Sequence, residues 1–136
     1  MPHHIRRHRL SLAIALAFLM AAASSVWAHH NMSALFDFND RITLTGSLSK
    51  FDWRNPHIGL TVDVKSGGAQ DVPWSIEGPA PGFFRNQDVS KADFENAFNK
   101  TVTAEVSRAR DHSNSGLLRT VTLPNGKVVS ACPQNC

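Results

Sequence analysis

The chain has 136 residues, a formal net charge of +3 and two cysteines, with 42% hydrophobic and 18% charged residues. This length allows one domain, and the composition excludes both a disordered chain and a disulfide-dense scaffold. The basic balance would suit a nucleic-acid-binding protein, so the position of the charges along the chain decides whether that class applies.

Residues 1–28 have the organisation of a secretory signal peptide. Three arginines among the first nine residues precede one uncharged apolar run over 10–23, and small residues end the segment at Ala28. The apolar run spans about 21 Å at about 1.5 Å per residue, which is less than the membrane's hydrocarbon core of roughly 30 Å. We expect cleavage after Ala28, a periplasmic or secreted protein, and no stable membrane span after cleavage.

Cleavage of this segment changes the electrostatics. It holds three of the 14 basic residues and none of the 11 acidic ones, so residues 29–136 carry 11 of each. Nucleic-acid binding needs a clustered excess of Lys and Arg, and we therefore expect no nucleic-acid partner. The remaining chain is long enough to fold alone, and we expect a monomer.

Two histidines follow the predicted cleavage site. His29 would become the N-terminus, where its α-amine and imidazole can bind a metal ion together. Nitrogen ligands of this kind suit Cu(II), and His30, His57 or His112 would complete the site. The alternative is that residues 29–40 are a polar N-terminal segment without a ligand. A copper ion or another transition metal is thus a hypothetical cofactor.

Alternation of apolar and polar residues predicts five strands and one short helix between 41 and 130. In the first strand the apolar parity switches near Ser49, which predicts a bulge or bend. Ser90, with Asp93 three residues later, predicts a helix start, and Pro73 indicates an edge position or a bulge. The strands are expected over 41–53, 58–65, 72–76, 101–107 and 117–123, and the helix around 94–98.

This order is typical of the OB fold. We predict a mainly β protein, a small OB-like five-stranded antiparallel barrel over 41–130 with one short helix between strands 3 and 4. Another small antiparallel barrel or sandwich is the alternative, because periodicity alone does not specify closure. Arg119 shares the parity of Leu117 and Val121, so either a bulge turns it outward or it needs a carboxylate such as Glu77. The bulge is the simpler interpretation.

In OB folds the connections after strands 1 and 4 flank the ligand-binding face. These connections carry His57 and His112, which would then border one site. The ordinary alternatives are a turn residue for His57, a solvated loop residue for His112, and core positions for Trp53 and Trp74. Without a metal, this face would recognise a protein, a glycan or a small ligand. The predicted ligand-binding residues are Trp53, Asn55, His57 and Arg119.

Cys132 and Cys136 lie in a tail over 131–136. In an exported chain a disulfide between them is the default, and closing so short a loop stabilises by about 2 kcal/mol at most. A thiolate metal site is the alternative. The sequence contains no G-x-S-x-G, H-E-x-x-H or P-loop motif, and we expect a binding module, not an enzyme.

Several segments together resemble a family of small exported bacterial proteins of unknown function. They are the A-H-H start at 28–30, W-x-N-P-H at 53–57, W-x-x-E at 74–77, Arg85, and G-L-L-R-x-V-x-L-P-x-G at 116–126. The resemblance implies an exported small β-barrel and brings no established activity, so no catalytic residue can be assigned from it. The chain departs from the family at 97–100, where a Pro-Gly-Asp turn is usual, and in the cysteine tail.

Overall fold

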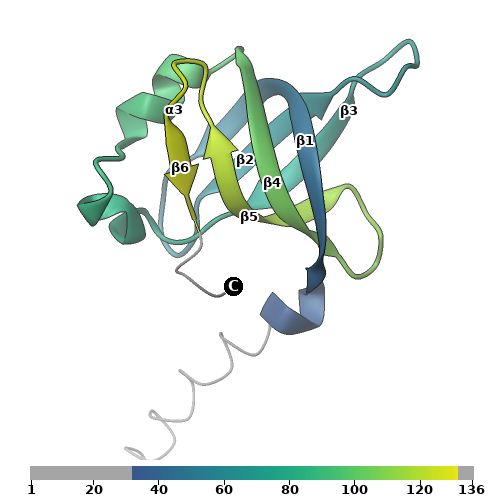
Figure 1. Cartoon of the computed structure of the whole chain (residues 1–136), viewed down its shortest axis with the longest axis horizontal. Helices are drawn as coiled ribbons and strands as arrows, with labels where there is room; N and C mark the ends of the chain where they lie inside the picture. The colour runs from purple at the N-terminus through teal and green to yellow at the C-terminus, as the bar shows by residue number, and fades with distance from the viewer. Residues whose placement is uncertain (1–31, 132–136) are drawn as a thin grey trace, which may run out of the picture. The chain divides into compact units, whose positions relative to one another are not determined.

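The computed structural model describes residues 32–131, and the chain divides into two compact units between Ala34 and Leu35. Of the first unit only the helical residues 32–34 are described. No helix within the described residues is long and apolar enough to cross a membrane. The second unit contains β1 (Phe36–Asp52), β2 (Gly59–Val64), β3 (Val72–Glu77), the 3-10 helix η1 (Pro81–Asn86), α3 (Lys91–Ala97), β4 (Thr101–Ala109), β5 (Ser115–Thr122) and β6 (Val128–Ser130) (Figure 1).

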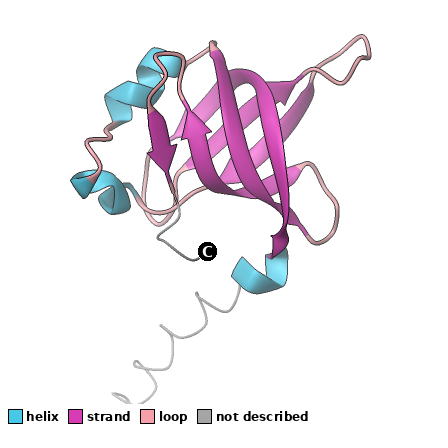
Figure 2. Ribbon diagram, in the orientation of Figure 1, coloured by secondary structure: helices cyan, strands magenta, loops and turns pink. Residues whose placement is uncertain are grey.

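The strands of this unit close into a ring. They pair in the order β3-β2-β1-β4-β5-β6, and β3 also pairs with β5 in parallel, so that five strands form the ring and β6 adds to β5. The other described ladders are antiparallel. Figure 2 shows the strands curving around a common interior, with η1 and α3 together on one side. The predicted OB-like architecture, with α3 between strands 3 and 4, is confirmed.

The long first strand serves two neighbours because it bends. Its first half pairs with β4 and its second half with β2. The register shifts between Leu48 and Lys50, which confirms the bulge predicted near Ser49. Gly46 lies in both ladders, and a Cβ added there would stand 2.1 Å from the carbonyl oxygen of Asp63. Only glycine allows the two strands to approach so closely at this corner.

The described structure extends the first strand toward the N-terminus. It begins at Phe36, earlier than the expected start at 41, and Phe36 is buried opposite Ala109. An irregular register between Phe36 and Arg41 interrupts the alternation that would have revealed this stretch in the sequence.

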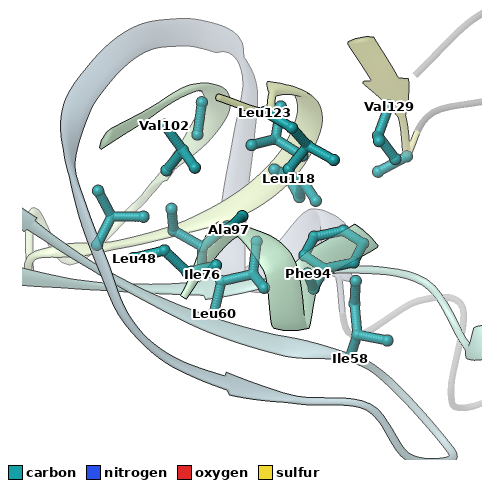
Figure 3. Close-up of a cluster of buried hydrophobic side chains, with 14 of the residues drawn as sticks. Leu48, Ile58, Leu60, Ile76, Phe94, Ala97, Val102, Leu118, Leu123 and Val129 are labelled. Carbon is teal, nitrogen blue, oxygen red and sulfur yellow. The ribbon is translucent and has the colours of Figure 1, made fainter. Parts of the chain in front are cut away.

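Large apolar side chains from every strand and from α3 fill the interior. Trp74 is 9% exposed and belongs to this core, as the ordinary interpretation predicted. In Figure 3 the α3 side chains of Phe94 and Ala97 lie among those of the strands. Phe94 is fully buried, and burial of such a side chain contributes about 1.5–3 kcal/mol to the free energy that holds the helix on the sheet. The labelled members are Leu48, Ile58, Leu60, Ile76, Phe94, Ala97, Val102, Leu118, Leu123 and Val129.

The start of α3 is fixed by the predicted pair of residues. Asp93 Oδ2 accepts hydrogen bonds from the Ser90 backbone N (2.8 Å) and Ser90 Oγ (3.1 Å). Its Oδ1 atom lies 3.0 Å from Nζ of Lys127, which also donates to the carbonyl of Asp88. The bond from the Ser90 backbone, supported by Lys127, lowers the pKa of Asp93. Helix α3 is therefore tied to the turn between β5 and β6.

The turn between α3 and β4 is joined to β1. Asn99 adopts a left-handed conformation with φ +57°. Its N–H donates to the carbonyl of Leu48 (2.8 Å), and the carbonyl of Lys100 accepts from the N–H of Leu48 (3.0 Å). These two bonds join the turn to β1, and β4 then begins at Thr101.

The predicted bulge near Arg119 is present, but it shifts the inward positions. The register of β4 and β5 changes between Glu105 and Val106, opposite Arg119. Before the bulge Leu118 faces the core, and Leu117, which the uninterrupted alternation placed inside, is only half-buried. The extra residue on β5 reverses the parity of every position before it.

Arg119 itself is not turned into solvent, and the simpler prediction is wrong on this point. It is 7% exposed, its Nη1 donates to Ser107 Oγ (3.1 Å), and its Nε lies 3.9 Å from Oε1 of Glu105. Burial, helped by the charge of Arg41, lowers the pKa of the guanidinium, and Glu105 partly offsets this. The nearby carboxylate is thus that of Glu105 and not that of Glu77.

Candidate functional site

The connection between β1 and β2 carries three of the four predicted ligand-binding residues, and two backbone hydrogen bonds fix its end. The N–H of Ile58 donates to the carbonyl of Pro79 (3.0 Å), and the N–H of Gly78 donates to the carbonyl of Ile58 (2.9 Å). The peptide bond between Asn55 and Pro56 is cis. The connection is therefore held against the segment that leads from β3 into η1.

A side-chain contact reinforces this attachment. Nδ1 of His57 lies 2.5 Å from Oε1 of Glu77, and the two side chains are 41% and 36% exposed. His57 belongs to the N-P-H turn and Glu77 to the W-x-x-E segment, so two stretches that carry the family resemblance meet here. His57 thus has a carboxylate partner, Glu77, at the end of β3.

Trp53, in the β1–β2 connection, packs against both helical segments, η1 and α3. Its ring stacks on Phe84 of η1, with centroids 5.4 Å apart and an interplanar angle of 28°. It also contacts Phe94 of α3, with centroids 5.3 Å apart and an angle of 41°. The indole is half-buried, and these aromatic contacts hold its orientation.

A hollow of about 390 Å³ lies beside Trp53. We call it the Trp53 hollow. Its walls come from the β1–β2 connection, the start of η1 and the start of α3. The lining residues are Trp53, Asn55, Ala80, Pro81, Gly82, Arg85, Val89, Ser90 and Lys91.

The ionisable residues that line the Trp53 hollow, Arg85 and Lys91, are both cations. Nζ of Lys91 lies 2.9 Å from Oε1 of Glu95 in the next turn of α3. The exposed guanidinium of Arg85 has no hydrogen-bond or ion-pair partner within residues 32–131. The hollow therefore combines an apolar wall with a cationic rim that has unused hydrogen-bond donors.

A second hollow, of about 400 Å³, lies between α3 and the β5–β6 turn. Its charged lining residues have opposite signs, Asp93 and Lys100, and the Asp93 carboxylate is already bound to Ser90 and Lys127. Among the described residues that line this hollow there is no aromatic side chain, and the charged ones have opposite signs. The Trp53 hollow is therefore the better candidate for a ligand site.

Three of the predicted site residues that the structure describes, His57, His112 and Arg119, are not among the residues that line the Trp53 hollow. Arg119 does not line it and instead binds Ser107 on the neighbouring strand. His112 is exposed, with φ +58°, in the β4–β5 connection. The β4–β5 connection contacts β3 at Ser75, whose N–H donates to the carbonyl of Asn114. His57 contacts the same strand at a different residue, Glu77.

The predicted metal site falls mainly on residues that the structure does not describe. His29 and His30 lie outside the described residues, as do Cys132 and Cys136. Residues 32–131 contain no group of three or more His, Cys, Asp or Glu side chains placed to hold a metal ion. A metal at the processed N-terminus stays a prediction.

Sequence reasoning does not indicate Arg85 or Lys91 as site residues. Arg85 belongs to the segments that carry the family resemblance, but the resemblance implies no role for it, and Lys91 lies outside those segments. Helix η1, which carries Arg85, is a single short 3-10 segment, too short to produce a periodic signal. The pattern that could have indicated it is the Pro81-Gly82 pair followed by two phenylalanines.

The closed ring of five strands and the Trp53 hollow define a small OB-like β protein with a candidate ligand site. The chain belongs to DUF6152, a family of unknown function, and the match to that family spans residues 15–119. This agrees with the resemblance to a family of unknown function. No curated protein and no solved structure matches the chain.

Proposed function

We propose that this protein is an exported module that binds a small ligand in the Trp53 hollow, without catalysing a reaction. The observation that carries the proposal is an aromatic wall, held by ring contacts, beside a hollow of about 390 Å³. The hollow also presents the guanidinium of Arg85, which has no partner among the described residues. Ligand sites of proteins commonly measure about 300–1,000 Å³ and combine apolar walls with a few polar groups. Export is supported by the signal-peptide organisation of residues 1–28.

A small ligand fits this surface better than a protein partner. The large apolar side chains that are exposed within the described residues are Leu35, Phe98 and Val128. They belong to three separate parts of the chain and none lines the Trp53 hollow. Large exposed apolar patches mark protein interaction sites, and within residues 32–131 no large exposed apolar side chain lines the hollow.

The test is a screen of small compounds against the ¹⁵N-labelled chain, read as chemical-shift changes at residues that line the hollow. A Gly82→Leu variant adds a bulky side chain at a residue that lines the hollow, and an added Cβ there meets nothing closer than Arg85 Nε at 4.0 Å. Gly68→Leu is the matched control in the β2–β3 turn, where the added Cβ meets only Ser66 Oγ at 3.5 Å. Both variants are expected to fold.

We expect compounds that shift the Trp53 indole N–H signal in the wild type and in Gly68→Leu but not in Gly82→Leu. The indole of Trp74, which is buried in the core, serves as the internal reference. Binding that survives in Gly82→Leu would place the ligand elsewhere and contradict the proposal.

A transition-metal site at the processed N-terminus is the second candidate function. The Ala28-His29-His30 sequence favours it, because cleavage would bring an α-amine and an imidazole together on one residue. The two candidates use different parts of the chain and can be tested separately.

A further inference from the structure

We infer that the ligand of the Trp53 hollow is an organic anion, a small molecule that joins a flat apolar group to a carboxylate. This inference rests on the proposed function and adds the chemical class of the ligand. It draws on three features of the hollow: the sign of its charges, the unused donors of Arg85 and the fixed orientation of Trp53.

The charges around the hollow favour an anion. Arg85 and Lys91 line it, and among residues 32–131 no carboxylate residue does. The acidic residues nearest to Lys91 in sequence are Asp93, Asp88 and Glu95, and none of them is among the residues that line the hollow. Asp93 binds Ser90 and Lys127, and Glu95 binds Lys91 itself. No carboxylate within residues 32–131 forms an ion pair with Arg85, so its guanidinium is an uncompensated positive charge at the rim in the described part of the chain.

Arg85 is the better anchor of the two cations. Its guanidinium has no partner among the described residues, whereas Lys91 is shared with Glu95. Arginine presents a planar fork of N–H donors that matches the two oxygens of a carboxylate. Arg85 Nε lies 4.0 Å from the point where a Cβ on Gly82 would stand, and both residues line the hollow.

Trp53 supplies the second point of attachment. Contacts with Phe84 and Phe94 fix its indole before any ligand arrives, which reduces the entropy lost on binding. An aromatic or other flat group of the ligand can stack on or against this ring while its carboxylate reaches Arg85. The side-chain amide of Asn55, also on the wall, can supply a neutral hydrogen bond.

The experiment uses the full ¹⁵N-labelled chain and planar aromatic compounds, each tested as a carboxylate, a carboxamide and an amine. Shifts of the Trp53 indole N–H and the Arg85 Nε–H report binding in the hollow. Arg85→Gln removes the charge at an exposed position. Arg54→Gln is the control, because Arg54 is 77% exposed, pairs with Asp52 and does not line the hollow.

We expect each binding carboxylate to have an affinity about tenfold or more above its carboxamide, and no measurable binding of the amines. Arg85→Gln should remove that preference, and Arg54→Gln should retain it. If the three forms bind equally and Arg85→Gln has no effect, the anion inference is overturned while the hollow remains a ligand site. If no compound of any charge shifts the Trp53 signal, the proposed function fails with it.

Discussion

Nδ1 of His57 lies 2.5 Å from Oε1 of Glu77, and this contact joins the connection after β1 to the end of β3. The same connection carries Trp53 and Asn55, and the segment after Glu77 leads to Pro81 at the edge of the Trp53 hollow. The contact therefore holds together two walls of the candidate site.

Replacement of either partner should loosen that attachment. We expect a double-mutant cycle of His57→Ala and Glu77→Ala to give a coupling free energy of about 0.5 kcal/mol, since both side chains are more than one-third exposed. Urea unfolding measures the coupling. The Lys65–Asp71 pair, in the hairpin at the far end of β2 and β3, is the control. Removing the His57–Glu77 contact should also shift the Trp53 indole N–H signal, and removing the Lys65–Asp71 pair should leave that signal unchanged. A coupling of zero would show that the contact does not support the connection.

Asp93→Asn tests the cap that ties α3 to the β5–β6 turn. The pKa of Asp93 is lowered from 3.8 in the folded protein, so its carboxylate stabilises the fold above that pH and the stabilisation is lost as the pH falls through the folded pKa. We expect Asp93→Asn to cost about 1 kcal/mol at pH 7, measured by urea unfolding.

The same measurement at acidic pH provides the check on that prediction. Below pH 3.8 the difference between wild type and Asp93→Asn should shrink, because protonation removes the charge in the wild type as well. Glu95→Gln, on the exposed face of α3, should change the stability by less than about 0.5 kcal/mol. A deficit for Asp93→Asn that is constant with pH would contradict the role of the charge.

The ring could be predicted from the sequence because its strands alternate cleanly between core and solvent. Leu60 and Val62 of β2 and Trp74 and Ile76 of β3 are buried at the expected positions. Near Arg119 the predicted bulge is present, but the predicted side-chain directions are wrong: Arg119 is buried, and Leu118 rather than Leu117 faces the core. Leu117 and Leu118 are equally apolar, so composition could not decide which one faces inward.

The candidate site was only partly predictable for a different reason. Trp53 and Asn55 were expected from the OB pattern, since the connection after strand 1 flanks the binding face. Arg85 and Lys91 reach the same hollow only through the packing of η1 and α3 around Trp53. That packing depends on tertiary contacts of Phe84 and Phe94, which have no short-range sequence signal.

The copper hypothesis predicts an outcome that depends on one cleavage position. Protein processed after Ala28 should bind one Cu(II) ion through the α-amine and imidazole of His29, with the d–d spectrum of a nitrogen-rich site. His29→Ala, or one extra residue before His29, should abolish that spectrum. His112→Ala, in the exposed β4–β5 connection, tests whether that histidine contributes. Unchanged affinity in the His29 variants would rule out the N-terminal site.

Gly46→Ala tests the close approach that allows β1 to pair with two neighbours. The added methyl group would stand 2.1 Å from the carbonyl oxygen of Asp63, so the backbone of β1 or β2 must move. We expect a loss of about 1–3 kcal/mol in the free energy of unfolding, the usual cost of overpacking. Gly59→Ala is the matched control, because its added Cβ would meet only Asp52 Cβ at 3.8 Å, an ordinary contact. Equal destabilisation by the two variants would show that glycine is needed in these strands for a reason other than the contact at Asp63.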